Sequence, residues 1–161
     1  MTDELTHVTD GDVQMVDVSG KPMTKRRAVA TGELQVQPST IDAIVADTVE
    51  KGDVLATARI GAVQAVKHTW ETIPMCHQIP ITNVETDVSL EDDTVSLMVA
   101  VETTGQTGCE MEALEGVTTG LNVVWDMVKA IEKTPDGQYP TTKIHNVRVI
   151  EKEKTAIDGS T

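Results

Sequence analysis

Asp126 and Lys129 stand three residues apart in a segment whose apolar residues follow helical spacing. Side chains at positions i and i+3 are neighbours on a helix, so this carboxylate and this ammonium group can hydrogen-bond each other. A carboxylate that orients an ammonium group is a familiar arrangement for acid–base catalysis. The plainer interpretation is a solvated helix surface, but the pair remains the first candidate for catalytic chemistry.

Basic residues are scarce, since the chain has 13 Lys and Arg against 26 Asp and Glu. A triphosphate needs several cations to offset its charge, so basic residues grouped in an acidic chain indicate a candidate phosphate site. The alternative is that each one only keeps the surface solvated, and the sequence does not show whether they converge. The basic residues in question are Lys25, Arg26, Arg27, Lys51, Arg59 and Lys67.

Cys76 and His77 are adjacent, which raises the question of a zinc site. Structural zinc needs four ligands with recognisable spacing, and the chain has no second Cys/His pair. Cys109 and the remaining histidines stand singly. The sequence therefore predicts no metal site, and a loop cysteine beside a solvent-facing histidine is the plainer interpretation.

Length and charge limit the classes of protein to which the chain can belong. A chain of 161 residues is enough for one domain, here taken as 1–161, with flexible ends expected at 1–12 and 154–161. The net charge of −13 argues against nucleic acid and acidic membranes as partners, and no apolar run is long enough to span a bilayer. Two cysteines are too few for a disulfide framework, which favours the cytoplasm. An acidic surface of this kind is typical of salt-loving cytoplasms.

Periodicity predicts the elements that must position these residues. The longest helix, 111–131, has an apolar stripe, and Glu112, Glu115, Asn122, Asp126 and Lys129 are expected on or around the opposite polar face. The whole order is strand, two helices, two strands, helix, strand, which predicts an α+β, ferredoxin-like split β-α-β fold with an antiparallel sheet and an additional helix. The expected elements are a strand at 25–37, a helix from an N-cap at Ser39 to about Glu50, a helix from an N-cap at Asp53 to about Trp70, strands at 79–90 and 94–103 with a bulge near Thr82, the helix at 111–131 and a strand at 143–150.

Five short motifs in a fixed order are similar to the cyclic pyranopterin monophosphate synthase family, the C proteins of molybdenum cofactor biosynthesis. The resemblance covers residues 13 to 133. The motifs are Met15-Val16-Asp17-Val18-Ser19, Lys51-Gly52-Asp53-Val54 with Ala56-Thr57-Ala58-Arg59, Ile73-Pro74-Met75-Cys76-His77, Thr107-Gly108-Cys109-Glu110-Met111-Glu112-Ala113-Leu114 and Asp126-Met127-Val128-Lys129-Ala130.

The resemblance implies a lyase that converts (8S)-3′,8-cyclo-7,8-dihydroguanosine 5′-triphosphate into cyclic pyranopterin monophosphate and diphosphate. It implies a homohexamer, a trimer of dimers, with active sites at subunit interfaces. The residues that match catalytic positions are Asp126, Lys129 and Lys51. Those that match substrate-binding positions are Met75, Cys76, His77, Met111, Glu112, Glu110 and Arg26. No resident cofactor is identified, and whether Mg²⁺ accompanies the diphosphate stays open.

Glu112 and Asp126 are fourteen positions apart on one predicted helix, a rise of roughly 21 Å. We therefore expect two subunits to share each site, with Lys51 and Glu112 from one and Asp126 and Lys129 from the other. Lys152 is a candidate replacement for a lysine of the Gly- and Lys-rich stretch that this chain lacks, and it stays outside the predicted set. The rival functions are a catalytically silent nucleotide-binding module and an acidic scaffold for a basic partner.

Overall fold

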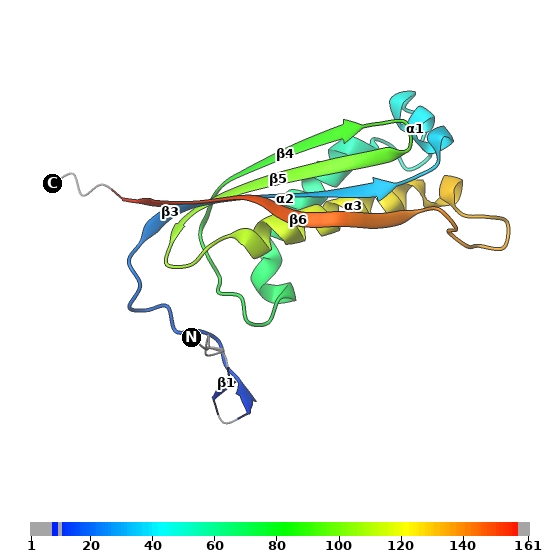
Figure 1. The fold of residues 1–161 in the computed structure, drawn as a ribbon. Helices are drawn as coiled ribbons and strands as arrows, with labels where there is room; N and C mark the ends of the chain where they lie inside the picture. The colour runs from blue at the N-terminus through cyan, green and yellow to red at the C-terminus, as the bar shows by residue number, and fades with distance from the viewer. Residues whose placement is uncertain (1–7, 10, 158–161) are drawn as a thin grey trace.

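Four antiparallel strands form the main sheet of the computed structural model, which describes residues 8–9 and 11–157 (Figure 1). Along the chain they are β3 (Thr24–Gln35), β4 (Ile81–Leu90), β5 (Thr94–Gly105) and β6 (Lys143–Ala156). Their order in the sheet is β4-β5-β3-β6. Helices connect β3 to β4 and β5 to β6, so this is the ferredoxin-like split β-α-β arrangement. The expected fold class is confirmed.

Three helices complete the fold: α1 (Pro38–Val45), α2 (Val54–Thr72) and α3 (Glu110–Glu132). α3 contacts β3, β5 and β6, while α2 packs against α3 and β4. Gly120 lets α3 approach closely, because a Cβ atom there would lie 2.3 Å from Leu97 Cδ2 of the sheet. A two-stranded hairpin of β1 (Val8–Thr9) and β2 (Asp12–Val13) precedes the sheet.

The core forms between the helices and the apolar face of β5, which was predicted from the alternation of apolar and polar residues. Val95, Leu97, Val99 and Val101 are all buried, as expected for one face of a strand. The apolar stripe of α3 packs onto them, and its buried members are Val117, Leu121, Val124 and Val128. This packing fixes the rotation of α3, so it also determines which side chains the helix presents outward.

The two ends of α1 differ from the expectation. The helix begins at Pro38, with Gln37 as N-cap and no side-chain cap, so Ser39 lies inside it. The carboxylate of Glu132 accepts a 2.8 Å hydrogen bond from the Gln37 backbone N–H, which satisfies the helix start in another way. The helix ends at Val45 rather than near Glu50, because the chain turns at Asp47, whose φ is 54°.

The predicted features of α2 and β4 agree better with the structure. Asp53 caps α2 as predicted, accepting a 2.9 Å hydrogen bond from the Ala56 N–H. The register of β4 on β5 shifts between Ile81 and Asn83, which confirms the predicted bulge. β6 runs to Ala156, beyond the expected end at Ile150, because it continues to pair with β3 as far as Thr24. Of the ends expected to be flexible, residues 1–7, 10 and 158–161 lie outside the described part.

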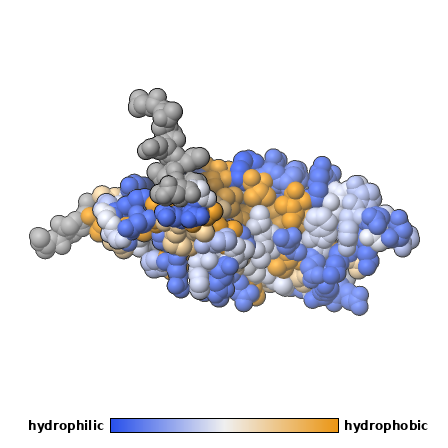
Figure 2. Space-filling model, turned by 90° about the horizontal axis from the view of Figure 1, so that it is seen from below, coloured by the Kyte–Doolittle hydropathy of each residue, from blue (hydrophilic) through white to orange (hydrophobic). Residues whose placement is uncertain are grey.

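The surface is mixed rather than uniformly acidic. Figure 2 shows hydrophobic side chains in the middle of one face of the molecule, between hydrophilic areas on either side. Exposed apolar side chains include Ile60 and Trp70 of α2 and Met111 at the start of α3. Within residues 8–9 and 11–157, no helix has the length and apolar character needed to cross a bilayer.

Candidate active site

A carboxylate held between two ammonium groups lies on the outer side of α3. Asp126 Oδ1 accepts a 2.7 Å hydrogen bond from Lys129 Nζ, and Asp126 Oδ2 accepts a 2.9 Å bond from Lys51 Nζ. Lys51 Nζ also donates to the backbone oxygen of Asp126 at 3.1 Å. We call these three residues the lysine–aspartate cluster. The predicted Asp126–Lys129 pair is present, and Lys51 joins it from a distant part of the chain.

The turn before α2 places Lys51 over α3. Val49 is buried, Gly52 has a φ of 103°, and Asp53 begins the cap of α2. A φ in this range favours glycine, so Gly52 allows the chain to reverse directly after Lys51. Lys51 is therefore held between a buried anchor and a capped helix, and its side chain can reach Asp126.

Ion pairing controls the protonation states of the cluster. Hydrogen bonds from Lys129 and then Lys51 lower the pKa of Asp126 to about 2. The hydrogen bond to Asp126 raises the pKa of Lys129 above its ordinary value. The side chain of Asp126 is 56% exposed, so the cluster is open to a ligand. It can supply a fixed carboxylate and two proton-bearing ammonium groups at one place.

The start of α3 forms a second polar feature, a cavity of about 340 Å³ that we call the α3 N-terminal pocket. It lies between the helix start, the loop after α2 and the chain before β3. Six of the predicted substrate-binding residues line it: Met75, Cys76, His77, Glu110, Met111 and Glu112. The structure thus brings together residues that the sequence places in two separate motifs.

Glu112 corrects one expectation from the helix pattern. It was expected on or around the polar face of α3, but only 4% of its surface is exposed. Glu112 shares a pocket with the loop that carries Cys76 and His77, and it is buried although Met111 of the same turn is exposed. Burial, with a smaller effect of the Glu110 charge, raises the pKa of Glu112 to about 7. A carboxyl group of this kind can exchange a proton near neutral pH.

The two cysteines lie close to the same buried carboxyl group. Burial, followed by the charges of Glu112 and Glu110, raises the pKa of Cys109 to about 11. Burial and the charges of Glu112 and Glu115 likewise raise the pKa of the Cys76 thiol. Both thiols are therefore poor nucleophiles. Among the described residues, no three His, Cys, Asp or Glu side chains are grouped so as to hold a metal ion.

Cations border the pocket. Lys21 lines it, and Lys152 of β6 forms an ion pair with Glu110. Burial tends to raise the pKa of Glu110, but hydrogen bonds from Lys152 and the backbone, together with the charges of Lys152 and Arg26, outweigh it and the net pKa is lowered. The prediction omitted Lys21 and Lys152. The scarcity of basic residues could have drawn attention to Lys21, whereas the Glu110–Lys152 contact depends on strand register.

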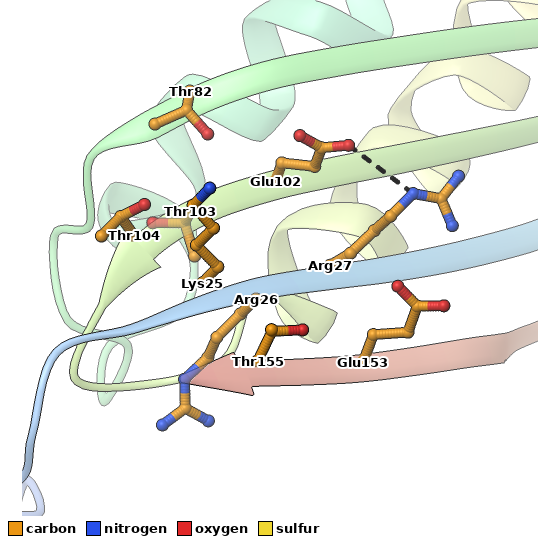
Figure 3. Close-up of a pocket in the computed structure, with 9 residues that line it drawn as sticks. All are labelled: Lys25, Arg26, Arg27, Thr82, Glu102, Thr103, Thr104, Glu153 and Thr155. Carbon is orange, nitrogen blue, oxygen red and sulfur yellow. Dashed lines mark ion pairs between the residues drawn. The ribbon is translucent and has the colours of Figure 1, made fainter. Parts of the chain in front are cut away.

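Arg26 lies on the face of the sheet that the helices cover, whereas its neighbours on β3 lie on the opposite face. Its Nε donates to Thr24 Oγ1 at 2.9 Å and its Nη2 to the Gln106 backbone oxygen at 3.3 Å, and its charge acts on Glu110. Figure 3 shows the Arg26 guanidinium group directed away from Lys25 and Arg27. Arg27 pairs with Glu102 at 3.7 Å on the other face. The alternation of the strand directs Arg26 away from Lys25 and Arg27, although all three residues line one cavity at this end of the sheet.

The two features lie apart on one chain. Glu112 and Asp126 are both on α3, fourteen residues and roughly 21 Å of helix rise from each other. Lys51 binds Asp126 of its own chain, whereas the sequence-based expectation put Lys51 and Glu112 on one subunit and Asp126 and Lys129 on the other. Each chain instead carries one lysine–aspartate cluster and one α3 N-terminal pocket.

The fold and these two features place the chain among ferredoxin-like α+β proteins that carry a charged surface cluster and a separate polar pocket. The chain belongs to the MoaC family, whose sequence pattern matches residues 15–155.

Curated relatives cover nearly the whole chain. A protein from Natronomonas pharaonis named "Probable cyclic pyranopterin monophosphate synthase" is 74% identical over 96% of this chain and 97% of its own length. One of the same name from Halobacterium salinarum is 72% identical over 94% of each chain. A protein from Methanothermobacter thermautotrophicus, named "Probable cyclic pyranopterin monophosphate synthase accessory protein", is 50% identical over 94% of this chain and 95% of its own.

Proposed function

We propose that this protein is a cyclic pyranopterin monophosphate synthase that acts in molybdenum cofactor biosynthesis. Its substrate would be the 3′,8-cyclised dihydroguanosine triphosphate, and its products the cyclic pterin monophosphate and diphosphate. The observation that carries the proposal is Asp126 hydrogen-bonded by two lysines, Lys51 and Lys129. The names of relatives 72% and 74% identical over almost the full length support it.

The residues suit the steps that such a conversion needs. Opening a purine ring and closing a pterin ring require repeated proton transfers, which we assign to the hydrogen-bonded pair of Asp126 and Lys129. Glu112, with a pKa of about 7, and His77 line one pocket, and we assign to them the binding of the polar edges of the ring. Loss of diphosphate puts negative charge on the leaving oxygens, which cations stabilise. The candidates are Lys51, Arg26, Lys21 and Lys152.

We also propose that two subunits build each active site. Thr119 stands midway between Glu112 and Asp126 on α3, in a hollow between α2 and α3 whose lining includes Gly61 and Ala65. If the α3 helices of two subunits cross antiparallel near Thr119, each N-terminal pocket meets the partner's lysine–aspartate cluster. Such a dimer has two complete sites, and a trimer of dimers would give the homohexamer. The protein would work in the cytoplasm without nucleic acid or membrane partners.

The direct test is to supply the cyclised triphosphate to the purified full chain and measure diphosphate and the cyclic pterin. We expect both products in equal amounts. Plain GTP should give neither, because its carbon–carbon bond between base and sugar has not been formed. Binding of the cyclised triphosphate without any diphosphate release would reject the proposal.

That negative outcome would favour the rival, a catalytically silent nucleotide-binding module. One relative, 50% identical to this chain, is named as an accessory protein, which is a reason to test this rival. A silent module needs cations for the phosphates but has no use for the Asp126–Lys129 pair. An acidic scaffold for a basic partner would need neither this pair nor the α3 N-terminal pocket. Both rivals therefore leave part of the described structure without a role.

A further inference from the structure

The connection between α3 and β6, residues 133–142, has a defined structure. The Thr134 N–H donates to the Gln138 backbone oxygen at 2.9 Å, and the Gln138 N–H donates to Thr134 Oγ1 at 3.0 Å. Gly137, with a φ of 83°, closes this turn. The Thr142 hydroxyl binds the Glu132 carboxylate, which is 1% exposed. Both ends of the connection are thus fixed, and Tyr139 leaves the turn at a set position.

Tyr139 packs onto α3 next to the lysine–aspartate cluster. Its ring lies edge-on against Trp125, with ring centroids 5.4 Å apart and planes inclined at 74°. Trp125 directly precedes Asp126, and Lys129 follows Trp125 by four residues, about one helical turn. Tyr139 therefore packs on the helix within one turn of both Asp126 and Lys129.

The electrostatics agree with this placement. The hydrogen bond and charge of Asp126 have the main part in raising the pKa of Lys129, and Tyr139 raises it further. This charge effect belongs to the ionised form of Tyr139, and it agrees with a ring that lies in the neighbourhood of the Lys129 ammonium group. A lysine side chain has four flexible carbons, and confining them costs conformational entropy. A neighbouring ring that blocks alternative positions reduces the freedom that remains.

We propose that Tyr139 is a positioning residue for Lys129: its ring, held on Trp125, bounds the space beside Lys129 and keeps the ammonium group on Asp126. The proposal rests on the proposed synthase function. Tyr139 itself takes no part in bond making or breaking. Its effect should appear in the catalytic step rather than in substrate binding, because Lys129 is needed in a definite place during proton transfer.

The test compares Tyr139→Ala, Tyr139→Phe and the control Gln138→Ala in the full chain. We expect Tyr139→Ala to lower kcat about tenfold with KM within about threefold, as expected for lost positioning. Tyr139→Phe keeps the ring and should restore kcat to within about twofold. Gln138→Ala, one residue away, should behave as wild type. Thermal melts would verify that all variants are folded.

Three outcomes would overturn the inference while the wild type remains active: an unchanged kcat in Tyr139→Ala, an equal loss in Gln138→Ala, or a Tyr139→Phe variant as impaired as Tyr139→Ala. A second measurement does not depend on activity. Lysine labelled with ¹³C at Cε allows the pKa of Lys129 to be followed by NMR. Tyr139→Ala should lower it, and an unchanged value would overturn the inference even if the wild type proved inactive.

Discussion

Lys51 Nζ lies 2.9 Å from Asp126 Oδ2, although the two residues are 75 positions apart in the sequence. The contact joins the turn before α2 to the exposed side of α3. It completes a carboxylate with two ammonium partners, since Lys129 occupies the other oxygen. One chain therefore provides the whole charged cluster.

Asp126→Asn should lower product formation at least about a hundredfold, the lower range for loss of an acid–base group. The side chain is 56% exposed and the change is isosteric, so folding and assembly should be unaffected. Diphosphate release and a thermal melt measure the two effects. Asp42→Asn, on the exposed side of α1, is the matched control and should be fully active. Near-normal turnover of Asp126→Asn would remove Asp126 from the catalytic set.

Mixing two inactive variants tests the shared active site. Glu112→Gln and Asp126→Asn, unfolded and reassembled together, should regain about a quarter of the wild-type activity, because half of the dimers are mixed and each has one intact site. Lys51→Ala mixed with Asp126→Asn should stay inactive, because both lesions fall in the same cluster. With mixing verified by mass spectrometry, recovery in the second pair but not the first would contradict the arrangement.

The buried Glu112 should make stability depend on pH. Its folded-state pKa of about 7 exceeds the ordinary 4.5, so the folded protein holds an extra proton between these values. Stability contributed by this group therefore falls as pH rises from about 4.5 through about 7. Glu112→Gln should be more stable than wild type at pH 8, by at most about 3 kcal/mol, and nearly equal at pH 4. Urea unfolding at the two pH values would show this.

The same unfolding series needs a control. Glu91→Gln, at an exposed turn between β4 and β5, should give no comparable difference between pH 4 and pH 8. If Glu112→Gln were instead less stable than wild type at pH 8, the Glu112 carboxylate would have to be ionised and well paired in the folded state.

Salt should stabilise the protein. With a net charge of −13, repulsion between acidic side chains opposes the compact state, and added salt screens it. We expect the thermal midpoint to rise along a potassium chloride series. A midpoint that stays flat or decreases would show that charge repulsion is not what limits stability.

Local features were predictable because they depend on neighbours in the sequence. The alternation of Val95, Leu97, Val99 and Val101 predicted a buried strand face, and the helical spacing after Met111 predicted α3. The Asp126–Lys129 pair also follows from helix geometry alone. The predicted N-cap at Ser39 is wrong because Pro38 occupies the first helical position. A distant residue, Glu132, binds the helix start instead.

The sequence by itself determined the order of elements, the ordered motifs and the identity of the charged side chains. Tertiary structure alone decided that Lys51 meets Asp126, that Lys152 of β6 reaches Glu110, and that Glu112 is buried. The physical reason is that strand register and loop packing bring together segments far apart in the chain. Burial then sets the proton affinity of Glu112, and no local pattern encodes how much water its neighbours exclude.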